Sequence, residues 1–260
     1  MTYATLQIET PAPHVLVVRL NRPQVLNALN TQMGRDVLEL WTRLTAEPGD
    51  ARCVILTGTG ERAFCAGGDL KERDGMTQAQ WQAQHELFER GFMALMELPL
   101  PVIAAVNGHA FGGGLELALC CDFIYAAKSA RFALSEVRLG IMPGGGGTQN
   151  LPRAVGERRA KELILTARAF TAEEGAQYGL VNKVCENVLA DALATADAIA
   201  ENAPLSVRQA KKSIHYGMQT DLLTGYRFEI EAYNRLVDTD DRREGVKAFN
   251  EKRKPVFKGK

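Results

Sequence analysis

The sequence predicts an α/β fold, in which helices cover a mostly parallel sheet and a helical region follows it. Three observations predict this fold. Short apolar stretches of strand length alternate with amphipathic stretches of helix length over the first half of the chain. From residue 156 onward, helical patterns dominate. The 260-residue chain has 46% apolar and 24% charged residues, which is enough for a globular protein with a sizeable core.

The expected strands are short runs of β-branched and other apolar residues. Residues 15–20 (VLVVRL) form the first strand, and the turn sequence Asn21-Arg22-Pro23 ends it. Further strands are expected over residues 53–57, 102–106 and 123–126. Runs with so few polar side chains are typical of strands that are buried on both faces of a parallel sheet.

The expected helices place apolar residues three or four positions apart. Residues 31–45 have this spacing; we expect Thr31 to cap the helix, and Pro48 and Gly49 follow its end. A second helix is expected over residues 81–98, before Pro99, and a third over residues 115–121. Helices between successive strands are what a parallel sheet requires.

The second half of the chain is predicted to be mainly helical. One strand is expected, over residues 180–184. Helices are expected over residues 158–165, 172–178, 191–200, 206–218, 222–237 and 240–254. We therefore divide the chain into an α/β core, residues 1–195, and a C-terminal helical region, residues 196–260.

Charge and cysteine content narrow the classes of partner and compartment. The formal net charge is +0, so no overall charge draws the protein to nucleic acid or to an anionic membrane. The five cysteines are odd in number and lack C-x-x-C spacing, which favours reduced thiols. No leader pattern and no apolar run of membrane-spanning length is visible. The expected location is the cytoplasm.

The first candidate site is the stretch 63–73, AFCAGGDLKER, which follows an expected strand. Gly67 and Gly68 allow unusual backbone angles and a close approach to a ligand. Their N–H groups could donate to an anion or a carbonyl oxygen. The alternative is an ordinary turn between a strand and a helix.

The second candidate site is the stretch 106–122, VNGHAFGGGLELALCCD. Three glycines, Gly112 to Gly114, lead into an apolar helix whose first N–H groups lack intrahelical acceptors. Glu116 lies in the first turn of that helix. The alternative is an acid that favours the helix dipole. A functional role is favoured because an acid in such an apolar run is costly when buried without partners.

The third candidate site is the stretch 130–153, ARFALSEVRLGIMPGGGGTQNLPR. Glu136 precedes four glycines, Gly144 to Gly147. The run is similar to a phosphate loop but lacks the Lys-Ser/Thr ending, so a nucleoside-triphosphate site is not expected. A solvated loop acid is the alternative for Glu136. The four histidines are scattered, and no metal site is expected.

Together these stretches resemble the enoyl-CoA hydratase/isomerase (crotonase) superfamily, from Asn21-Arg22-Pro23 to the charged C-terminal tail. The resemblance implies reversible syn addition of water to a 2-trans-enoyl-CoA, giving a 3-hydroxyacyl-CoA. It implies that the N–H groups of Ala66 and Gly113 form an oxyanion hole for the thioester oxygen. Glu116 would activate water and Glu136 would protonate C2. Isomerase relatives commonly keep only the later acid, so the pair favours hydration.

The resemblance also implies the contacts with coenzyme A, which is part of the substrate; no separate cofactor is expected. A basic residue is common in relatives at Gln24, which makes a phosphate contact there less expected. The acyl group should lie against parts of residues 81–98 and the C-terminal helices. The residues implied in binding coenzyme A or the substrate are Gln24, Val25, Leu26, Ala66, Gly67, Gly68, Asp69, Leu70, Gly112, Gly113, Phe249 and Lys252.

The family fold is a spiral of β-β-α units followed by helices that form trimers, often paired into hexamers. A homotrimer or homohexamer is therefore expected, with Phe249 and Lys252 reaching the site of a neighbouring subunit. Fatty-acid β-oxidation and branched-chain amino-acid breakdown both stay open as pathways.

Three alternatives remain open. The motifs look especially like the methylglutaconyl-CoA hydratase branch, and an enoyl-CoA isomerase would use the same oxyanion hole. An RNA-binding protein is the non-enzymatic alternative, because animal members of that branch are described as binding AU-rich RNA. In residues 31–45, however, two arginines are matched by two acids, so weak, salt-sensitive RNA binding is the most we expect.

Overall fold

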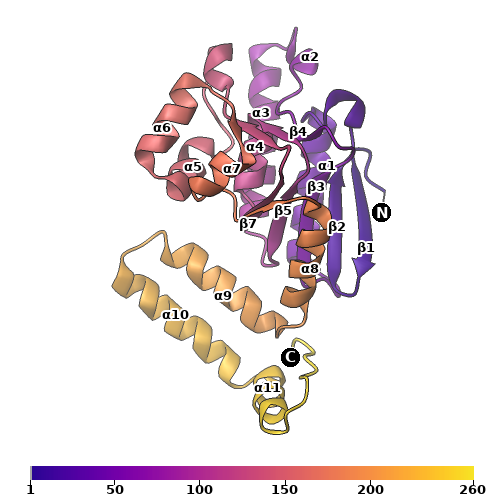
Figure 1. Cartoon of the computed structure of the whole chain (residues 1–260), viewed down its shortest axis with the longest axis vertical. Coiled ribbons are helices and arrows are strands. Elements are labelled where there is room, and N and C mark those ends of the chain that lie inside the picture. The colour runs from indigo at the N-terminus through magenta and orange to yellow at the C-terminus, as the bar shows by residue number, and fades with distance from the viewer. Residues whose placement is uncertain (1) are drawn as a thin grey trace.

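Two sheets form the centre of the molecule, and helices surround them (Figure 1). The computed structural model describes residues 2–260. In the larger sheet, β1 pairs antiparallel with β2 and the other neighbours are parallel. Its strands, in spatial order, are β1 Leu6–Ala12, β2 Val15–Leu20, β3 Cys53–Gly58, β5 Val102–Val106, β7 Phe123–Ala127 and β10 Lys183–Cys185. The smaller sheet contains β4 Ala63–Cys65, β6 His109–Phe111, β8 Arg131–Ala133 and β9 Phe170–Thr171.

The chain passes repeatedly from the larger sheet to the smaller one and then into a helix. The first unit runs from β3 through β4 to α2, Leu70–Arg73, and α3, Gln78–Met96. The second runs from β5 through β6 to α4, Gly113–Leu119, and the third from β7 through β8 to α5, Gly147–Val155. This succession confirms the expected spiral of β-β-α units. Because β4, β6 and β8 are neighbours in one sheet, the segments that follow them come together.

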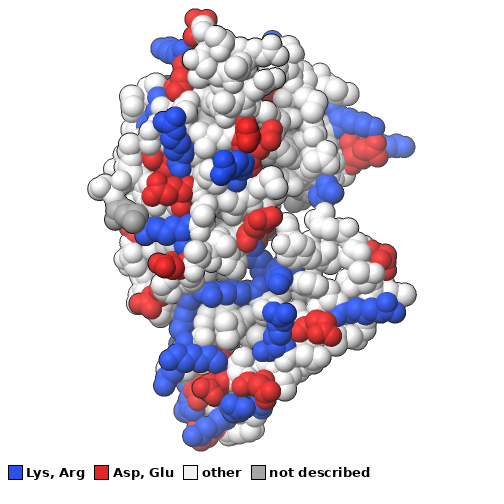
Figure 2. All heavy atoms as spheres, turned by 180° about the vertical axis from the view of Figure 1, so that it is seen from behind, with Lys and Arg blue, Asp and Glu red and all other residues white. Residues whose placement is uncertain are grey.

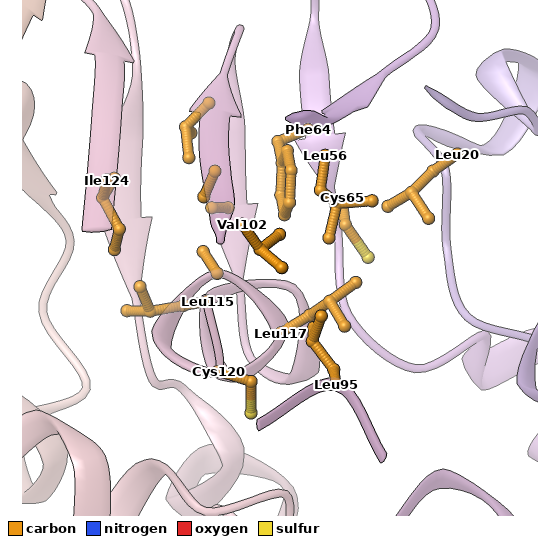
Figure 3. Packing of buried hydrophobic residues seen from close by; sticks show 14 of the residues in the cluster. Leu20, Leu56, Phe64, Cys65, Leu95, Val102, Leu115, Leu117, Cys120 and Ile124 are labelled. Carbon is orange, nitrogen blue, oxygen red and sulfur yellow. The ribbon is translucent and has the colours of Figure 1, made fainter. Parts of the chain in front are cut away.

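The main core lies between the two sheets and helices α1, Thr31–Ala46, α3 and α4. Strands β3 and β5 are buried along their whole length because they are central in the sheet. Helix α4 is short, and its Leu115 and Leu117 are fully buried. Figure 3 shows these two side chains beside Val102 of β5 and Ile124 of β7. This packing fixes the helix that carries Glu116.

Helix α8, Val188–Ala200, covers the opposite face of the larger sheet. Its small residues Ala192 and Ala196 pack against a second apolar cluster that includes Ile55. The predicted boundary between residues 195 and 196 therefore falls inside a helix that packs on the core. The three helices after it, α9 Pro204–Gly217, α10 Leu222–Val237 and α11 Asp240–Asn250, extend away from the body (Figure 1).

Several boundaries differ from the sequence-based expectations. Asn30, and not Thr31, caps α1, because its side chain accepts from the Met33 N–H at 3.0 Å. Helix α3 begins at Gln78, three residues before the expected start, because Thr77 and Gln80 form a capping box that apolar periodicity does not reveal. The last strand of the sheet lies over Lys183–Cys185 instead of residues 180–184.

Some short elements were not expected from the sequence. The four strands of the smaller sheet have two or three residues each, too few for a periodic signal. Strand β1 alternates polar and apolar residues only weakly. The remaining helices, α6 Glu157–Thr166 and α7 Ala172–Gln177, agree with the expected positions within about two residues.

The surface carries charges of both signs. Figure 2 shows basic and acidic side chains mixed over one face, with many Lys and Arg side chains on its lower half, where acidic side chains lie among them. Over residues 2–260, none of the helices has both the length and the apolar character needed to cross a bilayer. Low RNA affinity stays a prediction.

Candidate active site

A cavity of about 520 Å³ lies where the segments that follow β4, β6 and β8 meet helix α3. Backbone of the first two segments forms one wall, and aromatic side chains of α3 form another. Glu116 and Glu136 both line this single cavity. Its lining residues are Leu29, Ala66, Gly67, Gly68, Leu70, Arg73, Trp81, His85, Phe88, Phe92, Gly112, Gly113, Glu116, Ser135, Glu136, Leu139, Ile141, Met142, Gly144 and Gly145.

Glu116 enters the cavity from the first turn of α4 and is only 4% exposed. One carboxyl oxygen, Oε1, accepts hydrogen bonds from the Gly145 and Gly147 N–H groups at 2.7 and 2.8 Å. Burial raises the pKa of Glu116, whereas these two donors and the nearby His85 lower it. The bonds hold Oε1 in place, whereas Oε2 accepts no hydrogen bond within residues 2–260.

The glycine run Gly144 to Gly147 therefore holds a carboxylate of the protein itself. A Cβ built on Gly147 would lie 2.9 Å from Glu116 Oε1, and one on Gly145 would overlap the Phe92 ring. Only glycine allows the backbone to come this close. The run also begins α5, so its N–H groups lack intrahelical acceptors.

Glu136 differs from Glu116 in having no hydrogen-bond partner. It begins a short 3-10 helix, Glu136–Leu139, and both carboxyl oxygens are buried and unpaired within the described chain. Burial is the main cause that raises the pKa of Glu136 to about 7; the negative charge of Glu116 adds to it, and the nearby backbone N–H groups of Glu136 and Ser135 oppose it only in part. A carboxyl group in this state holds a proton near neutral pH and can donate it.

The two carboxyl groups flank one pair of glycines. A Cβ built on Gly112 would lie 3.0 Å from Glu136 Oε1, and one on Gly113 would lie 4.0 Å from Glu116 Oε2. Gly112 has φ of +53° and is the N-cap residue of α4. The fold brings together, in one cavity, two acids that lie 20 residues apart in the sequence.

Backbone donors face the same space. Gly113 is the first residue of α4, and its N–H has no acceptor among residues 2–260. Gly67, with φ of +94°, packs against it, since its built Cβ would lie 3.4 Å from Gly113 N. The Gly67 carbonyl oxygen accepts from the Leu29 N–H, and the Asp69 N–H donates to the Leu29 carbonyl oxygen. Because neighbouring residues in an extended segment direct their N–H groups to opposite sides, the Gly68 N–H points away from Leu29 and toward the cavity.

The expected donor role of Ala66 is corrected by this geometry. Its N–H already donates to the Leu26 carbonyl oxygen at 3.0 Å and is not free for a substrate oxygen. The Gly68 N–H has no acceptor in the described part of the chain and lines the cavity. The available donor pair is therefore Gly68 and Gly113.

The residues implied in binding coenzyme A divide into two groups. Ala66, Gly67, Gly68, Leu70, Gly112 and Gly113 line the cavity. The others do not line it within one chain. Gln24 and Val25 belong to a 3-10 turn, Pro23–Val25, and Leu26 follows it with φ of +55°.

Asp69 has a structural role. Its carboxylate pairs with Arg22 at 2.9 Å and caps α2 by accepting from the Lys71 and Glu72 N–H groups. Phe249 and Lys252 lie at the end of α11, away from the body of the molecule (Figure 1). Phe249 is 84% exposed, so neither residue reaches the cavity of its own chain.

The wall of the cavity formed by α3 was only partly expected. Trp81, Phe88 and Phe92 come from the predicted segment of α3, but the C-terminal helices contribute no lining residue in one chain. Arg73 and His85 were missed. The helical spacing of residues 81, 85, 88 and 92 is the signal that could have identified the face of α3 turned to the cavity.

Comparison with known proteins agrees with the geometry. The profile of the family described as "Enoyl-CoA hydratase/isomerase" matches residues 11–260. The chain is 43% identical to a short-chain-enoyl-CoA hydratase of Clostridium acetobutylicum over 242 residues, covering 92% of each chain. It is 41% identical to an (E)-benzylidenesuccinyl-CoA hydratase of Thauera aromatica, covering 95% of this chain and 96% of that protein. A crystal structure of an enoyl-CoA hydratase from Bacillus anthracis superposes with a TM-score of 0.96 at 45% identity, covering 98% of this chain and 100% of that one.

Proposed function

This chain belongs to the enoyl-CoA hydratase/isomerase family, and we propose that its cavity adds water across the 2,3 double bond of a 2-trans-enoyl-CoA. The enzyme is a hydro-lyase of the crotonase fold. The observation that carries the mechanism is the pair of unequal carboxyl groups, Glu116 and Glu136, in one cavity beside two free backbone N–H groups.

The thioester oxygen accepts from the Gly68 and Gly113 N–H groups in this mechanism. Addition at C3 moves negative charge onto that oxygen as an enolate forms. Donors already directed at such a charge contribute roughly 3–4 kcal/mol each in other enzymes. The N-terminus of α4 adds its partial positive charge, since Gly113 is the first helical residue.

The two acids divide the proton transfers. Glu116, held at Oε1 by two backbone donors, is the base that takes a proton from water while the water oxygen bonds to C3. Glu136, with its pKa near 7, is the acid that gives its proton to C2. One turnover leaves Glu116 protonated and Glu136 ionised, and exchange with solvent restores both. This acid–base chemistry needs no separate cofactor.

The quaternary structure proposed is a homotrimer or homohexamer. Many large apolar side chains of α9, α10 and α11 are exposed on the single chain, among them Leu222, Tyr226, Tyr233 and Phe249. An exposed apolar surface of this extent is typical of a subunit interface. In such an assembly, Phe249 and Lys252 contact coenzyme A bound to a neighbouring subunit. The five free thiols support a reducing compartment such as the cytoplasm.

Glutamine variants of both acids test the mechanism. We expect Glu116→Gln and Glu136→Gln each to lower kcat for crotonyl-CoA hydration by about 10³-fold or more, while affinity for a saturated acyl-CoA stays within a few fold. Glu86→Gln, which changes an exposed acid of α3 outside the cavity, is the matched control. Near-normal turnover of either cavity variant would remove that acid from the mechanism.

A 3-enoyl-CoA substrate separates hydration from isomerisation. We expect the wild-type enzyme to hydrate crotonyl-CoA much faster than it shifts the double bond of a 3-enoyl-CoA, because both acids are present. The opposite order of rates would identify an isomerase instead.

A further inference from the structure

Arg73 brings a guanidinium group to the aromatic wall of the cavity. It is the last residue of α2 and lines the cavity beside Trp81 and Phe88. Its guanidinium carbon lies 4.5 Å from the centre of the Trp81 ring and 5.7 Å from that of Phe88. Contact with aromatic faces leaves the edge of the guanidinium free to donate hydrogen bonds.

A buried amide fixes the position of this guanidinium. Arg73 Nε donates to Gln84 Oε1 at 2.8 Å, and Gln84 is only 3% exposed. The Gln84 amide nitrogen donates in turn to Thr31 Oγ1 and to Glu72 Oε2 at 2.8 and 2.7 Å. Because Nε is held, the two terminal nitrogens of Arg73 have a fixed direction, and neither donates to an acceptor within residues 2–260.

The charge of Arg73 is not matched by an ion pair in the described chain. Burial lowers the pKa of Arg73, and the nearby charge of Glu72 opposes this only in part. Arg73 is also not among the groups whose charge shifts the pKa of Glu116 or Glu136. A partly buried cation without an anion is unfavourable, and a ligand anion would relieve that cost.

The position next to Gly68 identifies which part of the substrate meets Arg73. A Cβ built on Gly68 would lie 3.1 Å from Arg73 Nη1, so glycine at this position leaves room for the guanidinium. The thioester oxygen is proposed to bind at the same glycine. The phosphates of coenzyme A are separated from the thioester by the whole pantetheine arm and cannot reach this point. An anion of the substrate that binds Arg73 would therefore belong to the acyl group.

We infer that Arg73 selects an enoyl-CoA whose short acyl group carries a carboxylate, bound by the two terminal guanidinium nitrogens as a bidentate pair. The inference rests on the proposed hydration reaction and specifies the substrate class of that reaction. Arg73 is a specificity-determining residue and takes no part in the proton transfers.

Two substrates that differ only at the chain end provide the test. 4-Carboxybut-2-enoyl-CoA carries a carboxylate where trans-2-pentenoyl-CoA carries a methyl group. We expect the wild-type kcat/KM to be at least about tenfold higher for the carboxylate substrate. Arg73→Met should lower kcat/KM for this substrate about 30-fold or more and leave that for pentenoyl-CoA within about threefold. Arg73→Lys, which keeps the charge but not the bidentate geometry, should lie between them.

Arg90→Met removes one positive charge from an exposed position of α3 outside the cavity and should change neither substrate. Thermal unfolding of each variant checks its folding. Wild-type preference for pentenoyl-CoA, or an equal loss on both substrates in Arg73→Met, would overturn the inference.

A binding measurement separates this inference from the proposed reaction. The saturated analogues 4-carboxybutanoyl-CoA and pentanoyl-CoA can be titrated into wild type and Arg73→Met by calorimetry. If the wild type prefers the carboxylate analogue and Arg73→Met abolishes this preference, the inference is supported, whether or not the unsaturated substrates are hydrated. A failure to hydrate either unsaturated substrate would refute the hydratase proposal alone. Equal affinities of the wild type for both analogues would refute the role of Arg73.

Discussion

The buried, unpaired carboxyl group of Glu136 predicts that Glu136→Gln stabilises the fold at alkaline pH. Burial and the charge of Glu116 raise the pKa of Glu136 from its ordinary 4.5 to about 7. Each unit of pKa corresponds to about 1.4 kcal/mol, so the rise from 4.5 to about 7 sets an upper bound of about 3.5 kcal/mol on the cost of ionising this group in the folded protein. The carboxyl group borders the cavity, so solvent screening reduces the expected cost to about 1–2 kcal/mol.

The sign of the effect follows from the two titrations. In the unfolded chain Glu136 ionises above pH 4.5, whereas in the folded protein it ionises only above about pH 7. Its contribution to the free energy of unfolding of the wild type therefore falls as the pH rises from 4.5 to 7 and is constant above that. Glutamine titrates in neither state. The advantage of the variant should grow over the same interval and then level off.

Thermal unfolding of wild type and Glu136→Gln between pH 5 and pH 8.5, at one protein concentration, measures this difference. At pH 8.5 the melting temperature of the variant should be about 2–4 °C higher than that of the wild type. The same substitution at the exposed Glu86 should give no pH-dependent gain. A variant that is no more stable at pH 8.5, or whose gain is the same at every pH, would refute the argument that the cavity disfavours the ionised form.

Three further predictions concern catalysis, the glycine run and assembly. The kcat/KM for hydration should fall as the pH rises above about 7, because Glu136 must be protonated. It should also fall at low pH, because Glu116 gains a proton there. A kcat/KM that increases from pH 7 to pH 9 would contradict this prediction. Gly145→Ala, whose Cβ would overlap Phe92 and lie 3.0 Å from Glu116 Oε2, should lose about 1–3 kcal/mol of stability and most of its hydratase activity. By contrast Gly91→Ala, in α3 with its nearest neighbour 3.5 Å away, should gain about 0.5–1 kcal/mol and stay active; denaturant unfolding and the crotonyl-CoA assay measure both. Light scattering at micromolar concentration should give the mass of three or six chains, and the mass of one chain would contradict the proposed assembly.

Glu116 could be identified from local sequence, because the reasons for its position are local. An acid in an apolar run after three glycines predicts a buried carboxyl group at a helix start, and the structure has this arrangement. Glu136 could be identified only through the family resemblance. Its approach to Glu116 depends on β8 pairing beside β6, and β8 has three residues. A strand of three residues is too short to produce a periodic pattern in the sequence.

Sequence reasoning chose Ala66 as the backbone donor, whereas the structure favours Gly68, and the reason for this error is different. Both residues lie in one glycine-containing loop, and a sequence motif can identify the N–H group of either one as a candidate donor to the substrate. Which of the two points into the cavity is decided by the hydrogen bonds of this loop to Leu26 and Leu29. These partners lie about 40 residues earlier in the chain, and the direction of each N–H is set by pairing that composition does not encode.

Each β-β-α unit of the spiral contributes different chemistry to the cavity. The first unit carries Gly68 and Arg73, and the second and third carry Glu116 and Glu136. In the proposed assignment, recognition of the acyl end and transfer of protons therefore reside on separate modules of the chain. A descendant enzyme could acquire a new substrate by altering α2 and the neighbouring face of α3 while inheriting its reaction unchanged.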